Sequence, residues 1–241
     1  MKQNIVYIVA INWDLQEPAI KSWKYWCDKN NCKFFIIDKP IVNVNYMAPQ
    51  WQRYYIYDIL DKNNIEYDNI LYVDADAIVK WDAPNFFDYS NNELGVVKDY
   101  ASLEWIQNGL NGYKYLFNNI EIDWEDYFCT GFLLSNKKHK SLYNNFIKFY
   151  NEYPMEFRTL QSKTLRKGFD QTPFNLFVRQ NNIKVQYLPN KFSLGSLNNK
   201  GILYNKMFID LGYIWQFNGV YYNARKQLMI NLWNEIKYNY E

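Results

Sequence analysis

Short apolar runs alternate with segments of helical periodicity in the first third of the chain. Residues 4–12 (NIVYIVAIN) form a continuous apolar run of strand length, as expected for a strand that is covered on both faces. Pro18 then suits the first turn of a helix, where the missing amide hydrogen of proline costs nothing. The apolar stripe that follows at helical spacing comprises Ala19, Ile20, Trp23, Trp26 and Cys27.

The next segments repeat this order. Residues 32–38 (CKFFIID) predict a second strand, residues 51–64 a second helix, and residues 69–79 (NILYVDADAIV) a third strand. Such an alternation is typical of an α/β protein. We therefore expect a Rossmann-like mixed sheet, mostly parallel and flanked by helices, with ligands bound beyond the carboxyl ends of the strands.

The second half of the chain is less regular, but it contains no linker, repeat or low-complexity tract. Its predicted strands are residues 94–98, 127–136 and 183–189, and its predicted helices are residues 141–154, 170–182 and 224–240. The last helix carries one apolar stripe, formed by Leu228, Met229, Leu232, Trp233 and Ile236. We therefore expect a single domain over residues 1–241.

Composition narrows the range of functions. The 27 basic and 25 acidic residues leave a net charge of +2, so we expect no nucleic-acid partner. The cysteines, Cys27, Cys32 and Cys129, match neither a zinc site nor an even set of disulfides, which indicates a reducing compartment. Asn12 and Asp14 interrupt the first apolar run, so we expect neither a signal peptide nor a transmembrane segment. A cytoplasmic protein is predicted, with peripheral membrane contact and oligomeric state left open.

The third predicted strand leads into two aspartates one residue apart, Asp74 and Asp76. Like charges at a poorly hydrated strand end cost free energy unless a cation or several hydrogen-bond donors lie nearby. Carboxylate oxygens are ligands that suit Mn²⁺ or Mg²⁺. In the other reading, one aspartate caps the next turn and the other is solvated.

The segment ILYVDADAIV resembles the Asp-x-Asp strand of GT-A fold glycosyltransferases. Further segments resemble, in the same order, the retaining glycogenin-like and lipopolysaccharide galactosyltransferase-like enzymes of the family-eight type. The resemblance implies a GT-A domain in which residues 1–80 bind the nucleotide and residues 81–241 hold the donor sugar, the acceptor and the C-terminal helix. It further implies that Asp74 and Asp76 bind Mn²⁺ or Mg²⁺, and that Asp74 also contacts the donor together with Ile11 and Asn12.

Two of these segments imply further donor-binding residues. In QWQRYYIYDILDKNN, Arg53 takes the position of a basic residue that faces the donor, although a surface arginine is the alternative. In YFCTGFLLSNK, Thr130 and Gly131 take the position of a stretch that lines the donor sugar, where Cys129 replaces the usual amide.

The segment FDQTPFN resembles the Asp-Gln-x-x-x-Asn signature of the retaining enzymes, with Asp170, Gln171 and Asn175 at the matching positions. The resemblance implies that Asp170 and Gln171 are the catalytic pair. Asp170 would bind donor hydroxyls, Gln171 would lie beside the anomeric carbon, and Asn175 would contact the donor. Asp170 is also a suitable N-cap for the helix that follows.

A last segment, YIWQFNGVYYNAR, resembles the closing His-x-x-Gly motif, with Gln216 in place of the histidine and Gly219 in register. The resemblance implies that Gln216 is the third metal ligand, although an amide binds transition metals more weakly than imidazole. Arg225 or Lys226 would then neutralise the leaving diphosphate.

Taken together, the segments predict a metal-dependent glycosyltransferase with Mn²⁺ or Mg²⁺ as cofactor. Its donor would be a nucleotide-diphosphate sugar, with UDP favoured and GDP open, and its acceptor a glycan or another hydroxyl compound, with retention of configuration. Two alternatives stay open: an inverting transferase with Asp170 as general base, and a non-catalytic carbohydrate-binding protein.

Other enzyme classes fit poorly. A phosphatase of the haloacid dehalogenase type carries its Asp-x-Asp after the first strand, and a sugar-nucleotide pyrophosphorylase needs a Gly-rich loop that AINWDLQEP lacks. The only histidine, His139, lies among lysines, and we expect it to be a solvated turn residue. A single histidine also excludes a His-rich metal site and argues against a Ser-His-Asp triad.

Overall fold

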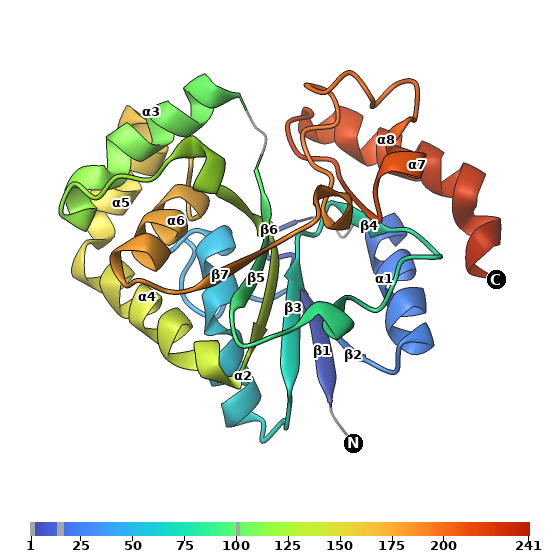
Figure 1. The fold of residues 1–241 in the computed structure, drawn as a ribbon, viewed down its shortest axis with the longest axis horizontal. Helices are drawn as coiled ribbons and strands as arrows, with labels where there is room; N and C mark the ends of the chain where they lie inside the picture. The colour runs from blue at the N-terminus through green and yellow to red at the C-terminus, as the bar shows by residue number, and fades with distance from the viewer. Residues whose placement is uncertain (1–2, 14–16, 100–101) are drawn as a thin grey trace.

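The computed structural model describes residues 3–13, 17–99 and 102–241 (Figure 1). The central sheet has six strands in the order β2-β1-β3-β6-β5-β7. Their bounds are β1 Asn4–Val9, β2 Lys33–Ile37, β3 Asn69–Val73, β5 Leu94–Lys98, β6 Phe128–Asn136 and β7 Val185–Leu188. Within this sheet, β6 pairs antiparallel with β3 and β5, and the other neighbouring strands pair parallel. The expected mixed, mostly parallel sheet is confirmed.

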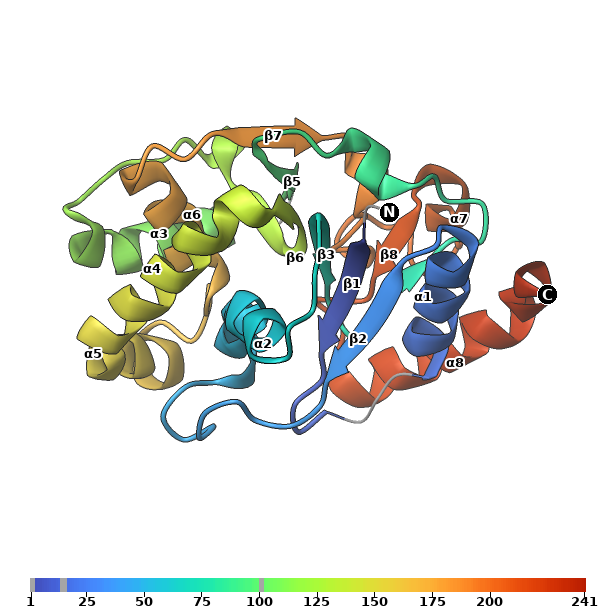
Figure 2. The ribbon, with the colours of Figure 1, turned by 90° about the horizontal axis from the view of Figure 1, so that it is seen from below.

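Helices cover both faces of this sheet. Figure 2 shows α2, α4 and α6 on one side and α1 and α8 on the other. The bounds are α1 Glu17–Lys29, α2 Ile56–Lys62, α3 Leu103–Tyr113, α4 Lys140–Glu152, α5 Pro154–Thr159, α6 Gln171–Gln180, α7 Phe208–Leu211 and α8 Tyr222–Ile236. Successive strand residues point to opposite faces. Tyr7 and Tyr72 therefore pack in the core beneath α2 and α4, whereas Val6 and Leu71 pack in the core that holds Trp26 of α1.

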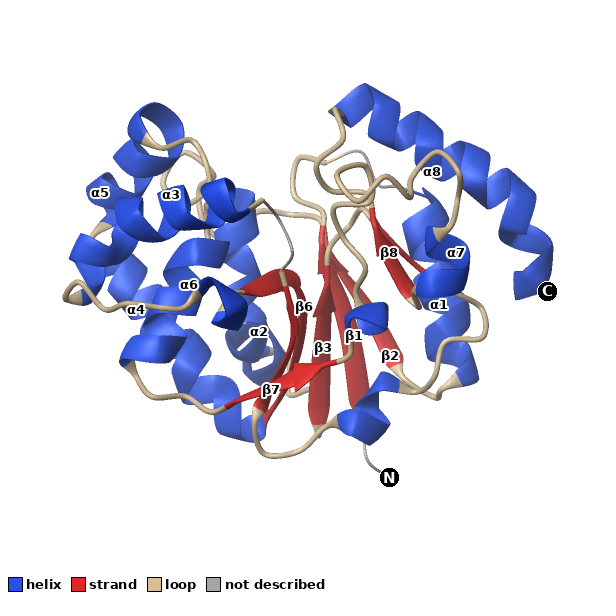
Figure 3. Ribbon diagram, turned by 45° about the horizontal axis from the view of Figure 1, so that its top comes forward, coloured by secondary structure: helices blue, strands red, loops and turns tan. Residues whose placement is uncertain are grey.

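The third predicted strand is interrupted. β3 ends at Val73, and the chain turns through Asp74 and Asp76 before β4 (Ala77–Val79). β4 pairs antiparallel with β8 (Ile214–Gln216) in a separate two-stranded sheet, and β8 stands apart from the central strands in Figure 3. The prediction of one strand over residues 69–79 is therefore wrong beyond Val73. Because the chain leaves the central sheet after Val73, Asp74 and Asp76 lie in the connection between β3 and β4 and not within a strand.

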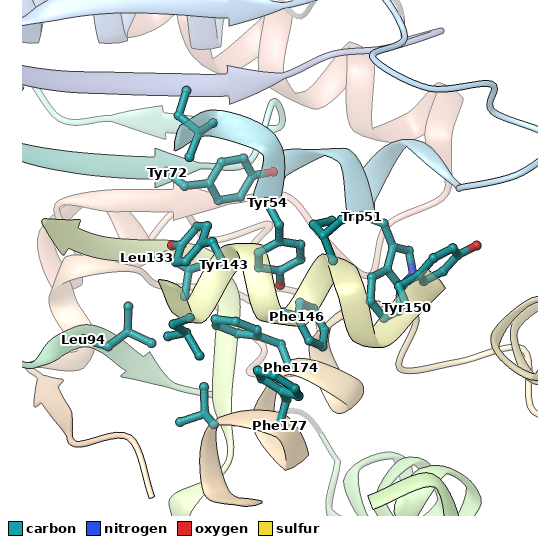
Figure 4. Packing of buried hydrophobic residues seen from close by; sticks show 14 of the residues in the cluster. Trp51, Tyr54, Tyr72, Leu94, Leu133, Tyr143, Phe146, Tyr150, Phe174 and Phe177 are labelled. Carbon is teal, nitrogen blue, oxygen red and sulfur yellow. The ribbon is translucent and has the colours of Figure 1, made fainter. Parts of the chain in front are cut away.

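The many aromatic residues chiefly build the core beside the sheet (Figure 4). The Trp51 ring stacks on Phe146 with centroids 4.9 Å apart, and the Tyr54 ring lies 4.8 Å from that of Phe174. Both Trp51 and Tyr54 belong to a 3-10 segment, Pro49–Tyr55, that precedes α2. Their burial fixes this segment against the sheet, which in turn fixes Arg53, one of the two residues between them.

The histidine is not solvated. His139 is 5% exposed, and its Nδ1 accepts a hydrogen bond of 3.1 Å from the backbone N–H of Asn136. The Asn136 side chain in turn accepts from the Lys138 backbone N–H. Asn136 and His139 therefore form a reciprocal cap of the 3-10 segment Lys137–His139 that precedes α4. Burial lowers the pKa of His139 to about 4, which keeps the ring neutral.

Candidate active site

A cavity of about 580 Å³ opens at one edge of the central sheet. The carboxyl ends of β1, β3 and β5 meet at this edge because these strands run in the same direction. Val9 at the end of β1, Asp74 after β3 and Asp99 after β5 all line the cavity. Residues from the start of α6 and from the start of α8, including Asp170 and Arg225, complete its walls.

The structure brings most of the predicted site residues into this lining. Those that line the cavity are Ile11, Arg53, Asp74, Asp76, Thr130, Asp170, Gln171, Gly219 and Arg225. Those that lie outside its lining are Asn12, Gly131, Asn175, Gln216 and Lys226. Residues far apart in the sequence therefore converge on one concave surface that carries several charged side chains.

Asp74 and Asp76 each pair with an arginine. Asp74 Oδ1 accepts a hydrogen bond of 2.7 Å from the Tyr72 hydroxyl and lies 3.3 Å from Arg53 Nη1. Asp76 Oδ2 lies 2.6 Å from Arg225 Nη1, and Asp76 is 7% exposed, which excludes the reading in which it is solvated. Burial, and then the charge of Asp74, raises the pKa of Asp76 to about 6, although Arg225 opposes this effect. Ionising both carboxylates is therefore costly, and a further cation would be favourable.

Arg53 is buried, not a surface residue. Its Nε donates to the Gln50 carbonyl at 2.7 Å and its Nη1 to the Thr130 carbonyl at 2.8 Å. Nε also lies 3.4 Å from Asp170 Oδ2, so the same guanidinium forms ion pairs with Asp74 and with Asp170. Burial is the largest single effect and lowers the pKa of Arg53, but Asp170, together with Tyr72, Asp74 and Tyr54, outweighs it, so the pKa is raised. Arg53 therefore stays positive inside the protein.

Asp170 stands at the N-cap position of α6, but its side chain makes no cap hydrogen bond. Its Oδ2 instead accepts a hydrogen bond of 3.0 Å from the Tyr54 hydroxyl, beside Arg53. Burial raises the pKa of Asp170, and the charge of Arg53 and the Tyr54 hydroxyl oppose this. The carboxylate is thus held in one orientation at the cavity wall.

Two amides of α6 tie this helix to the sheet. Gln171 Oε1 accepts from the Thr130 backbone N–H at 3.2 Å, and its Nε2 donates to Asp99 at the end of β5. Asn175 accepts from the Phe128 backbone N–H and donates to the Phe128 and Gln171 carbonyls, each at 2.9 Å. Asn175 is buried and lies outside the cavity lining, so in this structure it holds α6 against β6 and positions Gln171.

Gly131 leaves a space between Asp74 and Gln216. A Cβ at this glycine would lie 2.4 Å from Asp74 Oδ2, 2.6 Å from Gln216 Nε2 and 3.0 Å from Gln216 Oε1. Carboxylate and amide therefore face the same small space, and only glycine leaves it open. The Gln216 amide donates to Ser193 Oγ at 2.8 Å and lines a second cavity of about 100 Å³ together with Cys129.

The oxygen donors of Asp74, Asp76 and Gln216 fit a hard divalent cation. Within residues 3–13, 17–99 and 102–241, no group of three or more His, Cys, Asp or Glu side chains is arranged to hold a metal. Gln216 carries an amide oxygen near this place, since a Cβ at Gly131 would lie 3.0 Å from Gln216 Oε1 and 2.4 Å from Asp74 Oδ2.

Several lining residues were not predicted from the sequence: Trp13, Tyr72, Asp99, Ser102, Trp105, Phe169, Ser196, Asn199 and Asn218. Asp99 carried a usable signal, because it directly follows a predicted strand, as Asp74 does. The others belong mainly to connecting segments whose course depends on tertiary packing. Asn218 Oδ1, for example, accepts from the Ser196 backbone N–H at 2.7 Å and so joins two of these segments.

The chain is similar in sequence to one protein family and in fold to several solved glycosyltransferase structures. Residues 12–226 match the profile described as glycosyl transferase family 8. A glycosyltransferase involved in the glycosylation of the major capsid of PBCV-1 superposes with a TM-score of 0.60 at 10% identity, covering 96% of this chain and 100% of that chain. No curated protein matches the sequence.

Two larger proteins share the fold. The apo form of the glycosyltransferase GlyE of Streptococcus pneumoniae TIGR4 gives a TM-score of 0.52 at 15% identity, over 98% of this chain and 64% of that chain. The WbbM bifunctional glycosyltransferase gives 0.56 at 14% identity, over 100% of this chain and 51% of that chain. The present chain thus spans between half and two thirds of these two proteins.

Proposed function

Because the chain belongs to glycosyl transferase family 8, we propose that it moves a sugar from a nucleotide-diphosphate donor to a hydroxyl of a glycan acceptor. UDP is the favoured nucleotide. The observation that carries this proposal is the paired arrangement of Asp74 with Arg53 and Asp76 with Arg225 at the strand-end cavity. Such a mixture of carboxylates and guanidinium groups suits a diphosphate that arrives with a divalent cation.

In the proposed complex, Asp74, Asp76 and Gln216 hold Mn²⁺ or Mg²⁺. When bound, such an ion supplies charge neutralisation for a diphosphate leaving group. Arg225 lines the cavity beside Asp76, so its guanidinium is placed to stabilise phosphate oxygens as negative charge grows on them. Thr130, which also lines the cavity, offers a hydroxyl toward the donor.

The reaction proposed for this site retains the configuration of the sugar. Arg53 and Tyr54 orient the Asp170 carboxylate toward the donor hydroxyls. Gln171 has no useful basicity, so its amide positions the reacting groups and takes no proton. The oxygen of the leaving phosphate then receives the acceptor proton on the same face of the sugar.

The raised pKa of Asp170, caused by its burial, favours a second candidate, the inverting transferase with Asp170 as general base. The two candidates predict different products. We suggest incubating the protein and Mn²⁺ with UDP-glucose, UDP-galactose, UDP-N-acetylglucosamine or GDP-mannose, with methyl β-D-glucopyranoside or methyl β-D-galactopyranoside as acceptor, and following nucleotide release and the anomeric proton of the new linkage by NMR. An α-linked product from an α-linked donor supports retention, and a β-linked product supports Asp170 as base.

Two further observations concern the helices and the cysteines. None of the helices in the described part of the chain is long and apolar enough to cross a membrane. The three cysteines are free thiols. From the number and spacing of the cysteines in the sequence we propose a reducing, cytoplasmic location.

A further inference from the structure

Phe169, which directly precedes Asp170, lines the cavity yet is 43% exposed. Every other phenylalanine in the described part of the chain is buried or half-buried, so the exposed ring of Phe169 beside the Asp170 carboxylate stands out. The exposure does not arise from a loosely held chain. Asp170 on its C-terminal side is fixed by Tyr54 and Arg53.

The backbone around Phe169 is strained and held in place. Phe169 has a φ of 25° and Gly168 has a φ of 74°, in the region that non-glycine residues rarely adopt. The Phe169 carbonyl accepts from Gln161 Nε2 at 3.2 Å, and Gln161 Oε1 accepts from the buried Trp51 indole at 3.3 Å. The core therefore imposes this conformation, which directs an apolar ring toward the cavity. Strain of this kind is characteristic of functional sites.

Trp105 is another aromatic residue that lines the same cavity, as Trp13 and Tyr72 also do. Trp105 lies in the first turn of α3, where its backbone N–H donates to the capping Ser102 hydroxyl at 3.2 Å. The Trp105 ring packs edge-on against Tyr127 with the centroids 6.4 Å apart, which fixes its orientation. Phe169 directly precedes α6, and Trp105 lies in α3, which packs on α6. On the other part of the lining, Gly219 precedes α8 and Arg225 lies in its first turns.

We propose that Phe169 and Trp105 form the acceptor subsite, on which the apolar face of a terminal pyranose ring packs. The C–H groups on one face of a pyranose match the negative face of an aromatic ring, and the flanking hydroxyls need polar partners. Asp99 and Gln50 line the same cavity and supply such partners. Asp170 and Gln171 directly follow Phe169 in the chain, so an acceptor hydroxyl on this platform would lie close to the reacting sugar. This proposal rests on the proposed transferase function.

The test compares Phe169→Ala, Phe169→Leu and Phe169→Tyr with the parent protein. Methyl β-D-glucopyranoside and methyl β-D-galactopyranoside serve as acceptors, and hydrolysis of the same UDP-sugar without acceptor reports on the donor. Phe169→Ala and Phe169→Leu should raise the acceptor KM about tenfold, equivalent to about 1.4 kcal/mol, and the donor KM by a clearly smaller factor. Phe169→Tyr should restore the parent acceptor KM. Tyr115→Ala, which removes an aromatic residue that is 54% exposed and outside the cavity lining, is the matched control.

Saturation-transfer NMR with the two methyl glycosides separates failure of this subsite from failure of the transferase function. Transfer from the parent protein to either glycoside, lost in Phe169→Ala, supports the platform even if no UDP-sugar is hydrolysed. The proposal is wrong if neither glycoside receives saturation from the parent protein. It is also wrong if Phe169→Ala leaves the acceptor KM unchanged, or if it raises the donor KM in hydrolysis as much as the acceptor KM, because Phe169 would then serve the donor sugar.

Discussion

Replacing Asp76 by asparagine should raise the free energy of unfolding of the metal-free protein and should abolish its stabilisation by Mn²⁺ and UDP. The folded-state pKa of Asp76 lies at about 6, above its ordinary value of 3.8, because burial and Asp74 disfavour the ionised form. A raised carboxyl pKa lowers the free energy of unfolding as the pH rises from about 4 to 6, because the folded state binds the proton more tightly. At pH 7.5 this cost reaches up to about 3 kcal/mol, and Asp76→Asn removes it. The asparagine oxygen can still accept from Arg225, so that guanidinium keeps an acceptor.

The assay is urea unfolding of both proteins in EDTA at pH 7.5 and pH 4. Asp76→Asn should unfold at a higher urea concentration at pH 7.5, and the difference should shrink toward zero at pH 4. Added Mn²⁺ and UDP should stabilise the parent protein and not the variant. Asp82→Asn removes the same charge from a side chain that is 53% exposed and serves as control. If Asp76→Asn is the less stable protein at pH 7.5 in EDTA, the Arg225 contact outweighs the repulsion and our reading of the pair is wrong.

Four further predictions concern Gln216, Arg225 and Asn175 in and around the site, and the buried histidine His139. Gln216→His should lower the Mn²⁺ concentration that half-saturates the protein with UDP present, because imidazole binds Mn²⁺ better than an amide; an unchanged titration would remove Gln216 from the ligand set. Arg225→Gln should tighten Mn²⁺ binding in the absence of nucleotide, because the guanidinium competes with the ion for the Asp76 carboxylate. Electron paramagnetic resonance measures this binding. Lys226→Gln makes the same change of charge and should have a smaller effect, and equal effects would contradict direct competition. Asn175→Ala should lower the free energy of unfolding by about 2–4 kcal/mol in urea, because it strands buried backbone groups, and a loss below 1 kcal/mol would contradict this. The buried neutral ring of His139 contributes stability above pH 6.5 that is lost as the pH falls toward 4, up to about 3 kcal/mol. His139→Gln should therefore show a shallower loss of stability in acid, and parallel pH curves would refute this reasoning.

The regular part of the fold was predictable because its signals are local. The apolar runs of β1, β2 and β3 and the stripes of α1 and α4 follow directly from residue spacing. The break after Val73 was not predictable, because the following Ala77–Val79 is also apolar and its partner β8 lies far along the chain. Helix α3 carried a weak signal because glycine disfavours helix. A Cβ at Gly109 would lie 2.9 Å from Thr172 Oγ1, so this glycine permits the close packing of α3 on α6.

The same distinction applies to the site. Asp74, Asp76 and Asp170 stand in recognisable sequence patterns, and all three line the cavity. The arginine partner of each aspartate depends on how α8 and the Pro49–Tyr55 segment pack, which no local pattern records. Phe169 gave no sequence signal at all, because its exposure follows from a strained backbone that is held by the buried core.

The most direct test of the central claim is calorimetry of UDP binding with Mn²⁺ and with EDTA, on the parent protein and on Asp74→Asn. We expect UDP to bind the parent protein with Mn²⁺ present, and its affinity to fall at least tenfold in EDTA. We expect a comparable loss in Asp74→Asn, because a charged ligand of the cation is removed. UDP binding that is equally tight with Mn²⁺, with EDTA and in Asp74→Asn would contradict the claim that these strand-end aspartates hold the donor diphosphate through a divalent cation.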